Sequence, residues 1–163
     1  MEERLVAILL SREAYLKTTG AAEWSGGSFD GRIKVAVHEK PIGENTRRIL
    51  AHEMVHACLA STGEWPAWLH EGLAQKYSGE VRAEAWRQRV HQMAREGTLP
   101  RLDRMSQTWS RMSSDHAAIA YTMALEAVNL IFMTYGEQGI NNLARNPGWL
   151  PQLSAELDRR LRE

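Results

Sequence analysis

The sequence predicts an α+β fold in which helices dominate. Two segments near the N-terminus, 4–10 and 32–37, have the apolar run or the alternation typical of strands, whereas the chain after residue 44 reads mainly as helices. The chain has 163 residues, of which 44% are hydrophobic, and this suits one core. We therefore expect a single domain over 1–163, with a small N-terminal sheet packed on a helix and a helical C-terminal part.

The N-terminal part begins with a continuous apolar run. Segment 4–10 predicts a buried strand, and segment 11–19 predicts a short helix. A glycine-rich loop follows at 24–31. Segment 32–37 alternates polar with apolar residues and predicts a half-buried strand.

Glycine and proline mark the ends of two helices in the middle of the chain. Asn45 or Glu44 could cap the first helix, and Gly63 suits its end. Pro66 suits the first turn of the second helix. Small residues on one face of the second helix, among them Ala67, Ala74 and Ser78, permit close approach to the first helix.

The C-terminal half predicts three more helices. Segment 81–95 is charged and helical, and a Gly-Thr-Leu-Pro break then leads into an irregular stretch through residue 114. A long helix is expected at 116–135. The terminal segment 150–161 predicts an amphipathic helix, because leucine recurs at helical spacing and arginines occupy the other positions.

The long helix has the apolar character of a membrane span. Segment 117–135 contains one charged residue, Glu126, but polar residues interrupt it and no Lys/Arg cluster lies beside it. Mean hydropathy over the chain is −0.43. We expect a buried central helix and no membrane span; Glu126 then either supports a functional site or forms a salt bridge at its edge.

The sequence HEMVH at residues 52–56 carries the strongest functional signal. On a helix, His52 and His56 share a face, so both imidazoles can reach one metal ion at roughly 2.0–2.1 Å. From residue 49 to 60 every residue other than these two and Glu53 is apolar, so the helix is expected to be buried. Buried polar groups need partners, and a metal ion would satisfy all three together.

A catalytic zinc site needs a third protein ligand and an open fourth position. Glu71 is the best candidate, on the helix that Pro66 starts. Gly72 beside it costs roughly 1 kcal/mol relative to alanine in a helix, so we expect a packing reason for it. The alternative pattern HExxHxxGxxH would need glycine and histidine where this chain has Leu59 and Thr62.

These segments resemble the gluzincin metallopeptidases, and within them the peptidase-MA-like domain, in which HExxH is followed by W-x-x-E-G-x-A. Here that stretch is WLHEGLA at 68–74, and the loop at 24–31 and Ala-Tyr at 120–121 add weaker similarity. The resemblance implies a zincin-like fold and a zinc-dependent metallopeptidase. It implies one Zn²⁺ per chain, with zinc-activated water attacking the peptide bond, Glu53 as general base, and the ligands His52, His56 and Glu71.

The resemblance also assigns supporting roles. Tyr121 is the first candidate to stabilise the oxyanion and His116 is the second, while a purely packing role for Tyr121 stays open. Related peptidases often carry an aspartate four residues after the third ligand to orient a histidine, and this chain has Gln75, an uncharged acceptor. His70 points about 100° away from Glu71 on a helix, so we place it beside the site and not among the ligands.

Two further expectations concern the cleft. In zincin-like folds an extended peptide adds to an edge strand beside the cleft, and segment 32–37 is the candidate here. Tryptophans near the motifs, among them Trp24, Trp65, Trp68 and Trp109, either line the cleft or pack in the core.

Composition limits the partners. Twenty basic residues offset twenty acidic ones, so no steering toward nucleic acid or an anionic membrane is expected. The single cysteine, Cys58, excludes an internal disulfide and is expected in the core. We expect a monomer that meets a peptide or protein substrate. No signal peptide is visible, but a strand so near residue 1 also fits a piece of a longer, exported protein, so the compartment stays open.

Two other functions fit the same residues. A catalytically silent zincin-like domain would bind a protein or peptide partner in the cleft, with or without metal. A helical structural protein with an accidental motif would bind no metal. Replacing Glu53 by glutamine separates the first from a peptidase, because it should abolish hydrolysis and leave zinc binding nearly intact.

Overall fold

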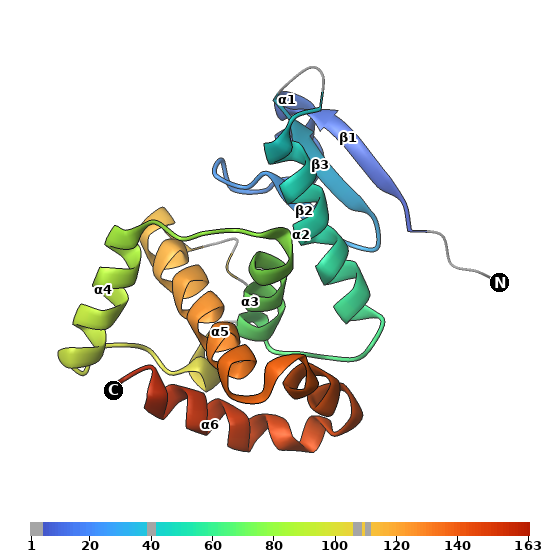
Figure 1. Cartoon of the computed structure of the whole chain (residues 1–163). Coiled ribbons are helices and arrows are strands. Elements are labelled where there is room, and N and C mark those ends of the chain that lie inside the picture. The colour runs from blue at the N-terminus through green and yellow to red at the C-terminus, as the bar shows by residue number, and fades with distance from the viewer. Residues whose placement is uncertain (1–4, 39–41, 106–108, 110–111) are drawn as a thin grey trace.

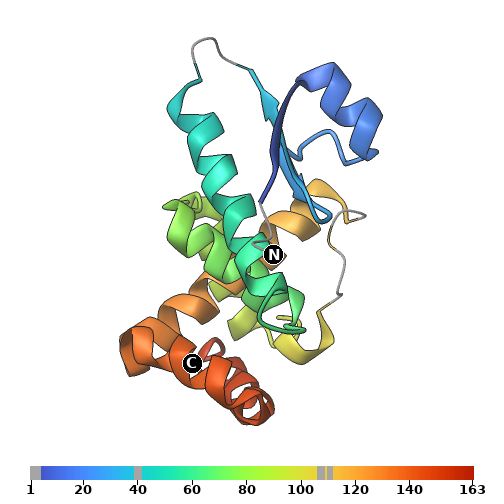
Figure 2. The same cartoon turned by 90° about the vertical axis from the view of Figure 1, so that its right-hand side faces the viewer.

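A small sheet at the N-terminus and a larger helical part form the protein, in a computed structural model that describes residues 5–38, 42–105, 109 and 112–163. The sheet and helix α2 lie at one end, and helix α6 lies at the other end (Figures 1 and 2). This arrangement confirms the predicted α+β class with helices dominant.

The sheet has the strand order β1-β3-β2. Strand β3 (Ile33–Val37) is central: it runs parallel to β1 (Ala7–Ser11) and antiparallel to β2 (Gly27–Phe29). Helix α1 (Arg12–Thr19) follows β1 and ends at Gly20, whose φ of 62° is left-handed.

The prediction that segment 32–37 lies at the sheet edge is therefore wrong. The edge on the α2 side of the sheet is β2, which lies inside the stretch expected to be a loop. A strand of three residues in a glycine-rich stretch is too short to show the alternation of polar and apolar residues that identifies a strand. The sequence pattern therefore gave no sign of β2.

Helix α2 (Glu44–Ala60) packs on the sheet, where Ile49 and Leu50 contact Ile33 and Val35. Its N-cap is Gly43 and no side chain caps it, so the expected cap by Asn45 or Glu44 is wrong.

The expected burial of α2 on all sides is also wrong. Met54 is 45% exposed and Cys58 is exposed, because the sheet and the following helix cover only part of α2. The prediction of Cys58 in the core fails for the same reason: on α2 it falls on the face that neither neighbour covers.

The helical part is built around α5. Its elements are α3 (Ala67–Ser78), α4 (Glu84–Arg95), the 3₁₀ turn η1 (Leu102–Arg104), α5 (Ser114–Arg145), η2 (Pro147–Trp149) and α6 (Leu150–Arg160). Helix α5 is kinked at Gly136, which has a φ of 59°. Buried residues of α5 pack against α3, α4 and α6, so the long helix is the centre of the main core.

Close packing of α3 against α5 explains the glycine at position 72, as expected from its place inside a helix. A Cβ at this position would lie 2.4 Å from the Ala124 carbonyl oxygen and 2.5 Å from a Val128 methyl group. The glycine thus lets α3 pack closely on α5. This packing determines how deeply the preceding residue, Glu71, is buried.

Helix α5 is long and apolar enough to cross a membrane by length and composition alone. Half of its most apolar window is buried inside the protein, and core helices pass the same test. The expected absence of a membrane span stays a prediction.

Candidate metal centre

Helices α2 and α3 bring the three predicted ligands together. His52 and His56 lie one turn apart on α2, and Glu71 reaches them from α3. Glu71 Oε2 lies 3.3 Å from His52 Nε2 and 3.6 Å from His56 Nε2. One ligand atom from each residue falls within 4.8 Å of the others, and all three residues are partly buried.

The spacing of these atoms suits a tetrahedral ion. Two atoms that each lie about 2.0–2.1 Å from such an ion are separated by roughly 3.3–3.4 Å. The two distances to Glu71 Oε2 are close to this value. Two imidazoles and one carboxylate also form a ligand set found in catalytic zinc sites, which leave one position open. The three residues could therefore hold a metal ion such as zinc.

The charges around the site also fit a divalent cation. Glu53, Glu71 and Glu80 surround the two histidines, and Arg82 supplies one positive charge. With both imidazoles neutral, two negative charges are left over. A divalent cation balances them, and this is the protonation state that histidine needs as a ligand.

The neighbouring carboxylates also favour a positive charge on His52 itself. Burial opposes a charge on His52, but its hydrogen bonds with Glu71 and Glu80 outweigh burial and raise its pKa to about 10. Burial would raise the pKa of Glu71, yet its bonds with His52 and His56 lower it to about 2. The cluster is therefore organised around a positive charge.

Glu80 is a partner of His52 that the sequence did not single out. Its Oε1 accepts a hydrogen bond from His52 Nδ1 at 2.6 Å, on the side of the ring away from Glu71. Gly79 ends α3 with a φ of 73°, and this C-cap turns the chain back toward α2. Gly79 was the only sequence signal near Glu80. A glycine after a helix predicts that the helix ends in a turn, but it does not predict which residue the following side chain contacts.

Gln75 does not replace the aspartate of related peptidases. The side chain is fully buried, and its amide nitrogen donates to the backbone oxygens of Glu71 and Tyr121 at 3.0 and 2.9 Å. Its amide oxygen accepts from Arg82. Gln75 thus joins α3 to α5, and the expectation that it accepts the imidazole N–H is wrong.

His70 lies beside the site, as expected from its angle on the helix. Its Nδ1 is 3.4 Å from His56 Nδ1, on the ring edge opposite Glu71. It is absent from the group of possible ligands among the described residues. Burial lowers the pKa of His70, with a further contribution from His56, and the neutral ring can accept a hydrogen bond from His56.

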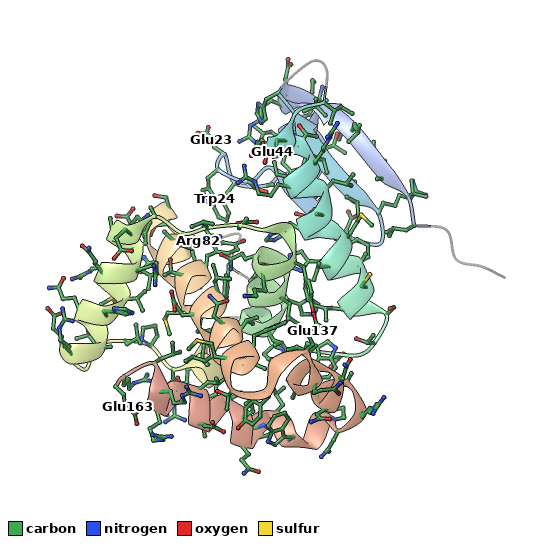
Figure 3. All side chains as sticks on the ribbon, viewed as in Figure 1. Glu23, Trp24, Glu44, Arg82, Glu137 and Glu163 are labelled. Carbon is green, nitrogen blue, oxygen red and sulfur yellow. The ribbon has the colours of Figure 1, made fainter. Side chains whose placement is uncertain are left out.

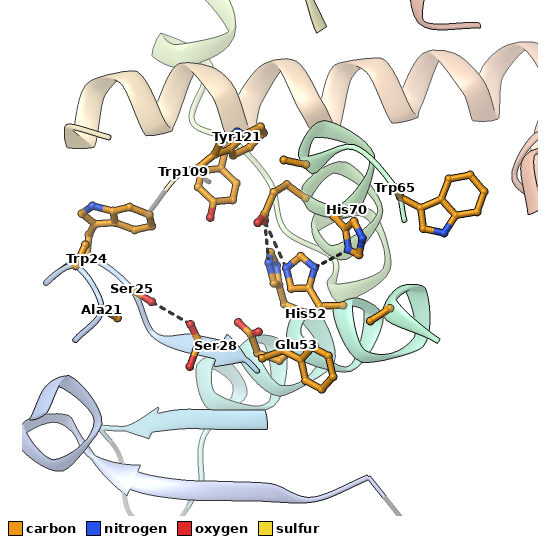
Figure 4. A pocket seen from close by; sticks show the side chains of 17 residues that line it. Ala21, Trp24, Ser25, Ser28, His52, Glu53, Trp65, His70, Trp109 and Tyr121 are labelled. Atoms are coloured by element: carbon orange, nitrogen blue, oxygen red, sulfur yellow. Dashed lines mark hydrogen bonds and ion pairs between the residues drawn. The ribbon is translucent and has the colours of Figure 1, made fainter. Parts of the chain in front are cut away.

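Glu53 points into the same cleft as the metal ligands (Figure 4). It is 6% exposed, and burial raises the pKa of its carboxyl against the opposing effect of the histidines. Strand β2 passes directly over it: a Cβ on Gly27 would lie 2.5 Å from Glu53 Oε1. Glycine at this position makes room for the carboxylate.

The cleft over the site has a volume of about 480 Å³. Trp24, Trp65, Trp109 and Tyr121 contribute to its walls, whereas Trp68 is buried in the core. Its titratable groups, apart from Tyr121, are those at the metal centre, and small residues such as alanine and glycine complete the lining.

Tyr121 and His116 occupy different places. Tyr121 reaches the cleft from α5, opposite Glu53, and its ring packs edge-on against Trp24 and Trp109 (Figure 4). Burial raises the pKa of its hydroxyl well above the usual value, so the group is a neutral donor. His116 is exposed at the start of α5, pairs with Ser113 at 2.7 Å, and does not line the cleft.

Glu126 lies away from the cleft. Its carboxylate accepts from Arg87 of α4 at 3.0 Å, so it is the salt-bridged edge residue and not part of the site.

Comparison with protein-family models, curated proteins and solved structures gave no match. The class of site therefore rests on its own geometry: two histidines and one glutamate arranged as a possible metal-binding group.

Proposed function

We propose that this protein is a zinc-dependent metallopeptidase with a zincin-like fold. The observation that carries the proposal is the convergence of His52, His56 and Glu71 beside a buried Glu53 at the base of an open cleft. An accidental HExxH segment would not require a carboxylate from another helix at ligand distance, and α3 provides one.

Zinc, when bound by these three residues, polarises a carbonyl group and makes water acidic enough to be used near neutral pH. The protein supplies the remaining chemistry. Glu53 accepts a proton from the attacking water and later passes it to the leaving amine. Its burial keeps the carboxylate out of bulk solvent and aimed at the cleft.

The oxyanion that forms at the former carbonyl oxygen needs a second donor. Tyr121 supports that role because its side chain enters the cleft from the wall opposite Glu53. Arg82 lies over the ring of Tyr121, with Cζ 4.9 Å from the ring centroid, and helps to hold the tyrosine in place.

Strand β2 supports an extended peptide as the substrate. It is the edge strand nearest Glu53, since a Cβ on its Gly27 would lie 2.5 Å from that carboxylate, and Gly27 and the preceding Gly26 help line the openings around the site. A peptide that adds to β2 would run past the metal centre with its backbone hydrogen-bonded to the sheet.

The proposal is tested by hydrolysis of a diverse peptide library with the zinc-loaded protein and with Glu53→Gln. The amide keeps the size of the side chain but cannot take the proton, so cleavage should fall by about 10²–10⁴-fold or below detection while zinc content stays the same. A wild-type protein that binds zinc, binds peptides and cleaves none of them would contradict the peptidase and favour a silent binding domain.

A further inference from the structure

Glu80 has contacts that an ordinary surface carboxylate lacks. It lies two residues beyond the end of α3 and is paired with His52 across the gap between α3 and α2. Its side chain is 25% exposed and binds through both oxygens. His52 Nδ1 and Ser78 Oγ donate to Oε1 at 2.6 and 3.3 Å, and Arg82 donates to Oε2 at 3.1 Å.

The backbone around Glu80 is fixed by the end of α3. The Glu80 N–H donates to the Gln75 carbonyl at 2.9 Å and the Gly79 N–H to the Lys76 carbonyl at 3.4 Å, which is the bonding of a Schellman C-cap. Gly79 supplies the left-handed residue that this cap needs. The position of Glu80 therefore follows from the position of α3, the helix that also carries Glu71.

Arg82 ties this segment to the core. Its guanidinium donates to Glu80 and to the buried amide oxygen of Gln75, and it stacks on Tyr121. Figure 3 shows Arg82 on the segment that leads from α3 to α4, on the side of the molecule where Trp24 lies. The carboxylate of Glu80 is thus held on one side by Arg82 while its other oxygen meets His52.

The Glu80 contact determines which nitrogen of His52 is available to a metal. A carboxylate that accepts from Nδ1 keeps the proton on that nitrogen and leaves the lone pair on Nε2. Nε2 is the atom that faces Glu71. The negative charge on the far side of the ring also makes the imidazole a stronger ligand.

We propose that Glu80 is a positioning residue of the metal centre, which orients His52 and strengthens it as a ligand from the C-cap of α3. The inference rests on the proposed metal site but not on the proposed hydrolysis. Helix α3 then has two roles: it carries Glu71, the third ligand, and Glu80 at its C-terminal end orients His52, the first ligand.

The test is the zinc affinity of Glu80→Gln, measured by competition with a chromophoric chelator at one fixed pH. Glutamine keeps the length and an acceptor oxygen but removes the charge, so the dissociation constant should rise about 10–100-fold. Glu80→Asp keeps the charge but is too short to reach His52 from the same backbone, and it should also weaken binding.

The matched control is Glu126→Gln. Glu126 has nearly the same side-chain exposure, 23%, and is likewise paired with an arginine, but it does not line the cleft that holds His52, His56 and Glu71. It should leave zinc affinity unchanged. Circular dichroism of each metal-free variant checks the fold, and loss of helix with unchanged zinc affinity would mark a purely structural role.

The outcomes separate the two proposals. If the wild type binds zinc and Glu80→Gln binds it within twofold as tightly, the role of Glu80 is refuted and the metal centre stands. If affinity falls as expected but no peptide is cleaved, Glu80 is a positioning residue of a site without peptidase activity. If the wild type binds no zinc, both proposals fail.

Discussion

At the scale of single residues, the two histidines of the centre have different partners. His52 donates to the carboxylate of Glu80, whereas His56 faces the imidazole of His70. A charged partner strengthens a ligand more than a neutral one does, so His52 should be the stronger of the two. The HExxH motif does not distinguish the two histidines. The difference between their hydrogen-bond partners comes from side chains outside the motif.

Tyr121 provides a residue-scale prediction. Tyr121→Phe removes the hydroxyl but keeps the ring that packs against Trp24 and Trp109. If the hydroxyl stabilises the oxyanion, kcat should fall by roughly 10²–10³-fold with zinc content unchanged. Steady-state kinetics on a cleaved peptide measure this, with Tyr77→Phe on the exposed face of α3 as the control. Activity within twofold of wild type would instead assign Tyr121 to packing.

At the scale of elements, strand β2 and helix α2 meet through glycine. Gly27 lies over Glu53, while the preceding Gly26 faces only the flexible end of Ile49. The two positions therefore allow a comparison of the same substitution next to the base and away from it.

We expect Gly27→Ala to reduce kcat at least tenfold, because the new methyl group would lie 2.5 Å from Glu53 Oε1 and 2.7 Å from an Ile49 methyl group. The Glu53 carboxylate must then shift, and such misplacement is costly in an active site. Gly26→Ala meets one terminal methyl group that can move, and it should retain most of the activity. Zinc content should be normal in both variants. Equal activity in the two would show that β2 does not position the base.

Most helices, but not the sheet edge, could be predicted at this scale. Apolar spacing with Gly63 and Pro66 marks the end of α2 and the start of α3 within a few residues of where they are observed. Strand β2 could not be predicted, because three residues are too few to show the alternation of a strand. Its pairing with β3 becomes visible only in the structure. The buried face of α2 was overestimated because periodicity says which residues are apolar, not how many neighbours cover them.

The candidate site shows the same division. The local motif identifies His52, Glu53 and His56, and Glu71 follows from the need for a third ligand on a neighbouring helix. Glu80 and Arg82 could not be found this way, because their roles depend on the direction in which the chain leaves α3. Gln75 was given the wrong partner because its position on α3 indicates a face, while its hydrogen bonds depend on how deeply α3 packs on α5.

At the scale of the whole molecule, the candidate metal centre lies between the sheet-bearing end and the helical part. Helix α2 belongs to the sheet, α3 belongs to the α5 core, and the ligands come from both. An ion bound between them should stabilise the folded protein by about 2.7 kcal/mol at a free concentration of 100 times its dissociation constant. Removing it with a chelator should lower the melting temperature accordingly.

Proton release provides a prediction for the whole protein. In the metal-free state the His52 pKa of about 10 keeps this residue charged at pH 7.5, and a bound histidine must be neutral. Zinc uptake should therefore release about one proton, and apparent affinity should increase with pH up to about 10. Calorimetry in buffers of different ionisation enthalpy measures the number, and uptake without proton release would contradict the ion pair.

The same pKa predicts how the metal-free fold responds to pH. The folded-state pKa lies above the usual 6.5, so the ion pairs of His52 stabilise the metal-free protein fully below pH 6.5. This contribution is lost as pH rises toward 10. Urea denaturation of the chelator-treated protein at pH 6 and pH 9.5 should show lower stability at the higher pH, and the zinc-loaded protein should lack this decrease.

The central claim is that His52, His56 and Glu71 hold one zinc ion, and the most direct test is the metal content of the protein purified without chelator or a metal-affinity column. We expect about one zinc per chain in the wild type and little or none in His56→Ala, since a catalytic site retains zinc through all three ligands. No zinc in the wild type, even after zinc is added and the excess dialysed away, would contradict the account and leave these histidines with a structural role.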